Sequence, residues 1–164
     1  MHPESYALMS RFAATVKPGA SVLDVGSRDV NGTYRGLFPG RVYTGIDIEA
    51  GPGVDLVVSG WTWPELQEML FDAVISGQCL EHTTQPWTVM EAIASRLLPG
   101  GRACVIVPST GPEHRYPIDC YRFMPDGLRA LGDWAGLRVV EIVKGPKSTP
   151  VDWGDIMAVY EHGG

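Results

Sequence analysis

Seven short runs of apolar and β-branched residues, each followed by a turn, are the feature that most restricts what this chain can fold into. Runs of this length and composition predict strands. They are Ser21–Val25, Arg41–Ile48, Val54–Val58, Phe71–Ser76, Arg102–Val107, Leu137–Val143 and Ile156–Tyr160. Helix-like periodicity lies between several of them, most clearly over Thr84–Leu98 and Pro125–Trp134, and a further helix is expected from Pro3 to Val16.

Strands that alternate with helices favour an α/β fold, here a Rossmann-like, mostly parallel seven-stranded sheet with helices on both faces. The last two runs are joined across Lys144–Asp155 without a helical pattern, so one antiparallel strand is expected near the C-terminus. The link Asp47–Val54 is too short for a crossover helix, so either a loop makes that crossover or the third strand is marginal. Open α/β sheets bind ligands at the carboxyl ends of their strands, which directs attention to the first strand–helix turn.

Composition excludes several classes of partner. The 164 residues carry a formal net charge of −6 and no basic run, which argues against binding to duplex nucleic acid. No apolar stretch approaches the ~20 residues that span a bilayer, and Met1-His2-Pro3-Glu4 does not resemble the start of a secretory signal. Cys79, Cys104 and Cys120 are odd in number and lack C-x-x-C spacing, so neither a disulfide framework nor structural zinc is expected. These features together predict a cytoplasmic protein.

The turn after the first strand carries two acids at informative positions. Asp24 lies near the end of the strand, Gly26 follows two residues later, and Asp47 comes 21 positions after Gly26. A carboxylate at that spacing can accept hydrogen bonds from both hydroxyls of a ribose. The alternative is a tight turn with no ligand. G-x-G-x-x-G is absent, and an acid beside the glycine would repel a pyrophosphate but attract a cationic ligand.

With these motifs the chain resembles the class I S-adenosylmethionine-dependent methyltransferases, from about Ser21 to Val143. The resemblance is carried by Val22–Gly26, Gly45–Ile48, Phe71–His82 (FDAVISGQCLEH) and Leu97–Val107 (LLPGGRACVIV). A narrower similarity is to small bacterial and phage methyltransferase domains with GSRDVNG, GIDIEAGPGVD and HRYPIDCYRF-like segments. The resemblance implies S-adenosylmethionine as cofactor and S-adenosylhomocysteine as product.

The resemblance also implies positions for the cofactor. Asp24, Gly26 and Ser27 would border its methionine end, with Asp24 facing the ammonium. Asp47 would take the ribose hydroxyls and Ile48 would lie against the adenine. The remaining expected cofactor-binding residues follow the third and fourth strands: Ser59, Gly60, Ser76, Gly77 and Gln78. Two departures stand out, because Arg28 and Val30 occupy positions where the class has glycines and Ser59-Gly60 replaces its usual acid.

The acceptor side is expected at the ends of the fourth and fifth strands. His82 is placed near the cofactor's sulfur by the resemblance, or it merely closes the pocket; Glu81 is expected to be an exposed or cap-region acid. The polar, proline-rich segment Pro108–Phe123 is typical of an active-site lid. The alternative is a structural loop in which Asp119 pairs with Arg122 and Tyr116 packs.

A hydroxyl acceptor would need a base. His114 is the first candidate, because the ordinary pKa of histidine, about 6.5, suits the task, and Asp119 is the second. The candidate catalytic residues are therefore His114, Asp119 and His82. Four further lid residues are candidates for substrate binding: Arg115, Tyr116, Tyr121 and Arg122. A metal held by His114 and Asp119 is a weaker alternative, and no metal is expected.

Other residues that invite a functional interpretation have simpler explanations. Most of the five tryptophans are expected in the core or between helices, while Trp61 and Trp63 could reach the ligand. Cys79 is expected to be a small apolar group rather than a nucleophile. No Asn/Asp-Pro-Pro-Tyr follows the fourth strand, which disfavours methylation of amino groups of DNA bases.

The chain is thus expected to be one domain, 1–164, with an N-terminal helix (1–17), a cofactor-binding core (21–107), an acceptor-side lid (108–124), and a C-terminal helix and strand pair (125–164). Two functions fit. The first is methyl transfer to a small-molecule acceptor such as a saccharide or another metabolite hydroxyl. The second is a cofactor-binding module without turnover, acting as a sensor or as a subunit of an assembly. A second copy or a partner protein would complete an otherwise open cleft.

Overall fold

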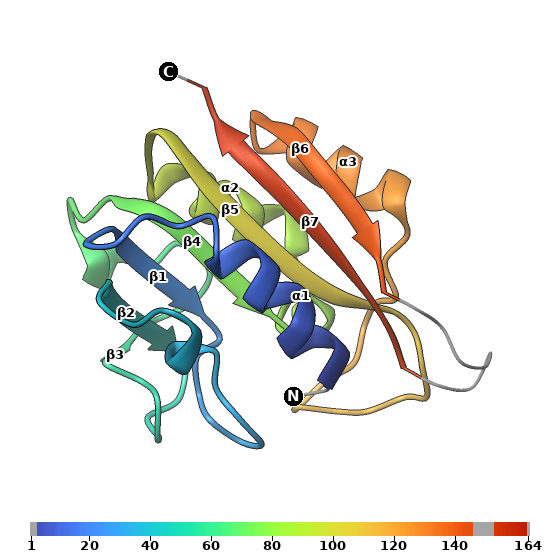
Figure 1. Cartoon of the computed structure of the whole chain (residues 1–164). Helices are drawn as coiled ribbons and strands as arrows, with labels where there is room; N and C mark the ends of the chain where they lie inside the picture. The colour runs from blue at the N-terminus through green and yellow to red at the C-terminus, as the bar shows by residue number, and fades with distance from the viewer. Residues whose placement is uncertain (1–2, 146–152, 164) are drawn as a thin grey trace.

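The computed structural model describes residues 3–145 and 153–163 and contains a seven-stranded sheet (Figure 1). The spatial order of the strands is β3-β2-β1-β4-β5-β7-β6. Their bounds are Ser21–Val25 (β1), Val42–Asp47 (β2), Leu56–Val57 (β3), Phe71–Gly77 (β4), Leu97–Thr110 (β5), Leu137–Lys144 (β6) and Gly154–His162 (β7). All seven coincide with or overlap the predicted strands. The link between the last two falls largely on residues 146–152, which lie outside the described residues.

Strand direction confirms the predicted mixed sheet. β1 pairs in parallel with both β2 and β4, and β4 pairs in parallel with β5. β7 runs antiparallel to β5 on one side and to β6 on the other, so it is the expected antiparallel strand near the C-terminus. Because β1 lies between β2 and β4, the chain leaves β1 toward one edge and later returns to its other side. That reversal of strand order is where open α/β sheets bind ligands.

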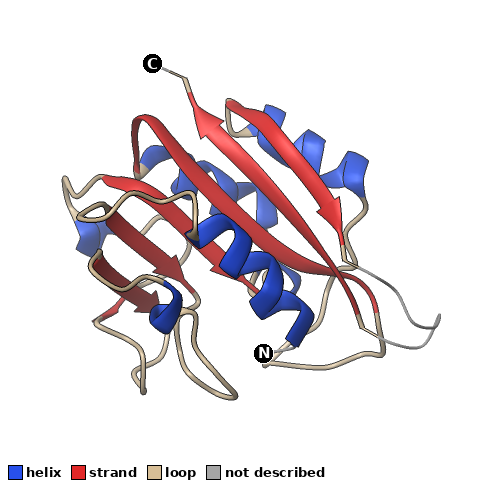
Figure 2. Cartoon of the chain, viewed as in Figure 1, coloured by secondary structure: helices blue, strands red, loops and turns tan. Residues whose placement is uncertain are grey.

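Helices cover both faces of the sheet, as predicted (Figure 2). α1 (Pro3–Ala13) packs on one face, where Val22 and Ile75 are buried beneath it. α2 (Pro86–Ser95) and α3 (Pro125–Trp134) cover the other face, which buries Leu23 and Val74. Successive residues of a strand point to opposite faces. The central strands are therefore apolar on both sides, which explains why their sequences read as continuous apolar runs.

The connections on the β3 side of the sheet contain no α-helix. The expected strand–helix turn after β1 is instead an irregular segment with a single 3₁₀ turn, Arg35–Leu37, so that expectation was wrong. Glycines at 32, 36 and 40 and a proline at 39 break any helical periodicity there. Between β2 and β3 a loop makes the crossover and β3 has only two residues, so both expectations for that link are confirmed.

The helix predicted over Thr84–Leu98 ends earlier, at Ser95, and the following strand begins at Leu97 instead of Arg102. Leu97 pairs with Phe71, whereas Arg102 pairs with Ala73, so the Pro-Gly-Gly segment bulges between these two pairs. Two tryptophans also depart from expectation. Trp134 is 63% exposed and Trp87 is 41% exposed, and both border a shallow pocket with residues of α3.

Candidate cofactor and acceptor site

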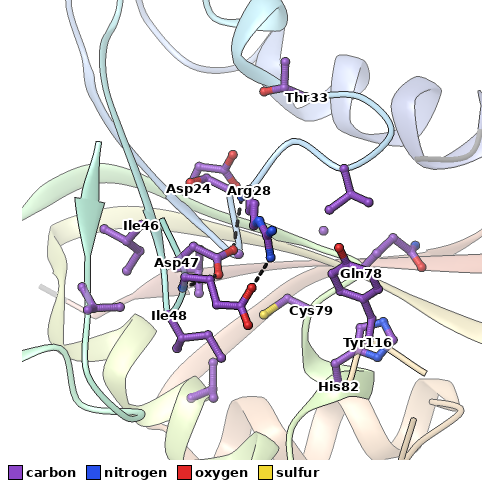
Figure 3. Close-up of a pocket in the computed structure, with 18 of the residues that line it drawn as sticks. Asp24, Arg28, Thr33, Ile46, Asp47, Ile48, Gln78, Cys79, His82 and Tyr116 are labelled. Carbon is purple, nitrogen blue, oxygen red and sulfur yellow. Dashed lines mark hydrogen bonds and ion pairs between the residues drawn. The ribbon is translucent and has the colours of Figure 1, made fainter. Parts of the chain in front are cut away.

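A cavity of about 540 Å³ lies at the carboxyl ends of β1, β2 and β4, where strand order reverses (Figure 3). Turns after these strands form one side of it, and residues of the segment after β5 form the other. Eight of the ten predicted cofactor-binding residues line it: Asp24, Gly26, Ser27, Asp47, Ile48, Gly60, Gly77 and Gln78. The remaining two, Ser59 and Ser76, do not line the cavity, and their hydroxyls form hydrogen bonds within the protein. The Ser59 hydroxyl and backbone N–H both donate to the Glu65 carboxylate, and the Ser76 hydroxyl donates to the carbonyl of Val25 at 3.2 Å.

Asp24 is a buried carboxylate at the floor of the cavity, 3% exposed. The Tyr43 hydroxyl donates a hydrogen bond of 2.5 Å to its Oδ2. Burial raises the pKa of Asp24 to about 7, although the hydrogen bond from Tyr43 and the charge of Arg35 act in the opposite direction. A cationic ligand in the cavity would stabilise this carboxylate.

The turn after β1 approaches the turn after β4 closely at Gly26. Its φ is +80°, and a Cβ at this position would lie 2.9 Å from the sulfur of Cys79. Any larger residue would therefore collide with the Cys79 side chain and strain the backbone. Burial raises the pKa of the Cys79 thiol to about 12, so it stays protonated, which fits a packing residue and not a nucleophile.

Asp47 ends β2 and borders the cavity beside the turn after β1. Its two carboxylate oxygens accept hydrogen bonds from the backbone N–H groups of Arg28, at 3.2 Å, and Glu49, at 3.1 Å. These bonds fix the carboxylate and still leave lone pairs for a ligand's hydroxyls. The Arg28 guanidinium forms an ion pair with Glu49, also seen in Figure 3. The side chain that replaces the second glycine is therefore held by a neighbouring acid.

The acceptor side is formed by the ends of β4 and β5. Of the seven residues predicted to serve there, four line the cavity: His82, His114, Arg115 and Tyr116. The rings of His82 and His114 meet edge to face, with centroids 4.7 Å apart. Trp153 also meets His114 edge to face, at 4.6 Å between ring centroids. His114 therefore contacts two aromatic rings.

The other three predicted residues, Asp119, Tyr121 and Arg122, lie behind the cavity wall. The carboxylate of Asp119 accepts hydrogen bonds of 2.6 and 2.8 Å from Arg122 and one of 2.7 Å from the His114 backbone N–H. These bonds and the positive charge hold the pKa of Asp119 well below its usual range. Tyr121 donates to the Thr84 carbonyl at 3.3 Å. The Asp119–Arg122 pair of the structural-loop alternative is therefore present, whereas Tyr116 is 51% exposed and borders the cavity.

Glu81 was expected to be exposed or near a helix cap, and that expectation was wrong. The 3₁₀ turn Leu80–His82 directs its side chain inward, and the carboxylate is 0% exposed. Its backbone carbonyl accepts a hydrogen bond of 2.7 Å from Cys120, which ties the lid to this turn. Neither carboxylate oxygen has a hydrogen-bond partner among the described residues. Burial raises the pKa of Glu81 to about 8.

Sequence reasoning missed one wall of the cavity, formed by the irregular segment between β1 and β2. Five of its residues line the cavity: Val30, Asn31, Gly32, Thr33 and Tyr34. Tyr34 is only 4% exposed, and a Cβ at Gly77 would lie 2.4 Å from its hydroxyl oxygen. A segment without periodicity gives no signal for such a contact. Trp61 and Trp63, by contrast, line the cavity as expected.

These features fit S-adenosylmethionine. Its ammonium is the kind of group that the buried Asp24 carboxylate calls for, and Asp47 has acceptors for two ribose hydroxyls. The Ser27 hydroxyl and the Gln78 carbonyl oxygen are buried polar atoms without hydrogen-bond partners among the described residues, so they are available to a polar ligand. The cavity volume also suits a nucleoside-sized ligand.

Solved structures share this fold, although no protein-family model and no curated protein matches the chain. A Bacillus halodurans protein described as a methyltransferase is 13% identical with a TM-score of 0.77, over 99% of this chain and 100% of its own. The Burkholderia thailandensis 1,6-didemethyltoxoflavin-N1-methyltransferase, solved with bound 1,6-didemethyltoxoflavin and S-adenosylhomocysteine, is 18% identical (TM-score 0.69; 99% of this chain and 78% of its own). The [4+2]-cyclase SpnF is 15% identical (TM-score 0.73; 94% and 80%).

By its strand order and these similarities, the chain has the fold of the class I S-adenosylmethionine-dependent methyltransferases. The sequence-based prediction of this fold is confirmed. SpnF shows that the fold also serves a cyclase, so the reaction has to be argued from the site. Among residues 3–145 and 153–163, no helix is both long enough and apolar enough to cross a bilayer.

Proposed function

We propose that the chain transfers a methyl group from S-adenosylmethionine to a hydroxyl of a small-molecule acceptor. The observation that carries this proposal is the placement of Asp24 and Asp47 at adjoining strand ends, in one cavity that also holds two histidines. When bound, S-adenosylmethionine supplies a methyl group already activated on a sulfonium sulfur, and S-adenosylhomocysteine remains as product. The protein then has mainly to hold and orient the reactants.

The cofactor-binding residues divide the cavity between the two ends of the ligand. Asp24 binds the ammonium, while the backbone of Gly26 and Gly77 allows close approach. Ser27 and Gln78 supply polar atoms that have no hydrogen-bond partner within residues 3–145 and 153–163. At the other end Asp47 accepts from the ribose hydroxyls and Ile48, 51% exposed, offers an apolar surface to the adenine. Gly60 and the backbone near Ser59 lie at the adenine edge, and Ser76 supports this wall by joining β4 to β1.

On the acceptor side, His82 and His114 face the hydroxyl that is methylated, and His114 accepts its proton as the oxygen bonds to carbon. Asp119 acts through His114 as a positioning residue, because its carboxylate is already committed to Arg122 and the His114 backbone. Arg115 and Tyr116 border the cavity and contact the acceptor. Tyr121 and Arg122 hold the lid in place.

The second candidate function is a cofactor-binding module without turnover, completed by a partner or a second copy. The observation in its favour is that Arg28 and Val30 stand where the class has glycines. The ordered lid favours the enzyme, because a module that only binds the cofactor has no need of two histidines at the acceptor end.

Titration calorimetry tests the proposal, with S-adenosylmethionine, S-adenosylhomocysteine and NAD as a control. We expect the first two to bind and NAD not to bind. Incubation with labelled cofactor and a panel of saccharides and other hydroxylated metabolites then tests turnover. Binding of S-adenosylmethionine without formation of labelled product would favour the cofactor-binding module. Absence of binding to both cofactor forms would exclude both functions for the isolated chain.

A further inference from the structure

Glu81, His82 and His114 bring three metal-binding side chains together at the acceptor end of the cavity. One donor atom from each lies within 4.8 Å of the other two. The carboxylate Oε1 of Glu81 is 3.7 Å from Nε2 of His82. His82 and His114 also border the cavity, so a ligand could reach the space between them.

Glu81 is the member of this cluster whose side chain lacks hydrogen-bond partners among the described residues. Its carboxylate is fully buried, and neither oxygen has a hydrogen-bond partner in the described part of the chain. A buried carboxylate without partners is costly, because it has lost its hydration without replacement. A buried carboxyl group either keeps its proton or is paired with a positive charge, and a metal ion held beside the two imidazoles would supply that charge.

The two histidines are oriented as metal ligands usually are. The Nδ1 atom of His82 lies 2.6 Å from the carbonyl oxygen of Ile118, and a carbonyl can only accept, so Nδ1 carries the proton. In the neutral ring the lone pair is then on Nε2, the atom nearest Glu81. The Asp119 carboxylate lies 3.5 Å from Nδ1 of His114. A carbonyl and a carboxylate behind the two imidazoles are the outer-shell partners that orient histidine ligands.

We propose that Glu81, His82 and His114 bind a divalent first-row transition metal ion, such as Zn²⁺, Fe²⁺ or Co²⁺. Two imidazole nitrogens and one carboxylate oxygen favour these ions over Mg²⁺ and Ca²⁺, which prefer oxygen ligands. Bonds of about 2.0–2.2 Å require the three donor atoms to draw closer together, through side-chain rotation. Three protein ligands leave at least one coordination position open toward the cavity.

A metal ion bound by Glu81, His82 and His114 would change how the acceptor's hydroxyl loses its proton. An ion at this place would bind the acceptor's hydroxyl oxygen and lower its pKa, so that the proton passes to solvent water as the oxygen bonds to the methyl carbon and the carbon–sulfur bond of the cofactor breaks. His114 would then act as a ligand and not as the proton acceptor. This use of the ion rests on the proposed methyl transfer. Binding of the ion does not, and it can be measured on the protein without cofactor or acceptor.

The experiment is a titration of EDTA-treated protein with Co²⁺, followed by visible absorption, with Zn²⁺ added afterwards as a competitor. We expect one equivalent of Co²⁺ to bind, with weak d–d bands and without the strong bands of thiolate ligands. Loss of an outer-shell partner already costs about 10–100-fold in metal affinity, so Glu81→Gln and His114→Ala should each weaken binding by at least about 100-fold. His162→Ala, a histidine at the end of β7, is the matched control and should bind like wild type.

Circular dichroism and binding of S-adenosylhomocysteine establish that the variants are folded. If Glu81→Gln does not fold, the metal affinity of His114→Ala tests the proposal instead, because the His114 side chain is 33% exposed and its truncation should be tolerated. No binding of either metal, or binding that His114→Ala leaves unchanged, would overturn the proposal. Asp47→Ala should lose cofactor affinity and keep Co²⁺ binding, so failure of the metal site and failure of the proposed function give different results.

Discussion

The hydroxyl of Tyr43 on β2 donates a hydrogen bond of 2.5 Å to Asp24 on β1, and Asp24 lines the cavity. This bond stabilises the charged form of a carboxylate that burial otherwise destabilises. The balance leaves the pKa of Asp24 raised to about 7, so the group titrates near neutral pH. Its protonation state then depends on both pH and any ligand charge.

The first prediction is that affinity for S-adenosylhomocysteine rises with pH up to about 7. Below pH 7 Asp24 is protonated in the free protein, and an ammonium that pairs with its carboxylate must displace that proton. The dissociation constant should therefore fall by up to about tenfold per pH unit from pH 5.5 to 7 and then level off. Calorimetry in buffers of different ionisation enthalpy measures both the affinity and the proton released.

Two controls identify Asp24 as the source. Asp24→Asn should bind more weakly and with an affinity that does not change over this range. 5′-Methylthioadenosine lacks the amino acid portion, and its binding to wild type should not depend on pH. A raised pKa also means that the folded state holds the proton more tightly than the unfolded chain. Asp24 therefore contributes less to stability as pH rises from about 4 to 7.

If the affinity of Asp24→Asn for S-adenosylhomocysteine still rose with pH as in wild type, Asp24 would not be the group that causes the pH dependence of binding.

The second prediction concerns Asp47. Asp47→Ala should weaken binding of S-adenosylhomocysteine by at least about 100-fold, since hydrogen bonds to a charged group contribute ~1.5–3 kcal/mol each and two hydroxyls are involved. Glu49→Gln is the matched control, because Glu49 is a neighbouring carboxylate whose charge is committed to Arg28. An exposed ion pair contributes only ~0–1 kcal/mol, so this control should lose less than about fivefold. Equal losses in the two variants would count against a ribose contact at Asp47.

The third prediction separates catalysis from binding. Once an acceptor is identified, His114→Ala should lower kcat by about 100-fold or more, because its imidazole either accepts the hydroxyl proton itself or binds the metal ion that promotes loss of that proton. The affinity for S-adenosylhomocysteine should stay within twofold of wild type. Asp119→Asn should also lower kcat, by a smaller factor and with little change in KM, because it misorients His114 without removing it. Full activity in His114→Ala would remove the histidine from the reaction.

The sequence predicted the sheet and most of the residues that line the cofactor end of the cavity, for physical reasons that can be named. Strand β1 was located to the residue, because a continuous apolar run is what burial on two faces requires. Asp24 and Asp47 were found because they lie at the carboxyl ends of β1 and β2, and the carboxyl ends of parallel strands meet at one edge of a sheet. Glu81 and Tyr34 were missed or misplaced because their burial is set by irregular turns and long-range contacts, which leave no periodic trace. The position of Asp119 behind His114 likewise depends on a fold of the lid that its composition does not encode.

The fourth prediction concerns stability and uses two glycines of α3. A Cβ at Gly132 would lie 2.6 Å from the ring of Tyr160, which is fully buried and held by a hydrogen bond of 2.9 Å to the Leu128 carbonyl. Gly132→Ala should therefore destabilise the protein, because overpacking costs ~1–3 kcal/mol and outweighs the ~1 kcal/mol that alanine gains as a helix former. Denaturant unfolding followed by circular dichroism measures the difference.

Gly127 is the matched control on the same helix. It is exposed, and a Cβ there would meet nothing within 4 Å. Gly127→Ala should raise the free energy of unfolding by ~0.5–1 kcal/mol, since only the backbone entropy and helix propensity change. Both variants lie far along the chain from the cofactor-binding residues, so neither should alter the affinity for S-adenosylhomocysteine. If Gly132→Ala proved as stable as Gly127→Ala, α3 could not pack on β7 through the contact between Gly132 and Tyr160.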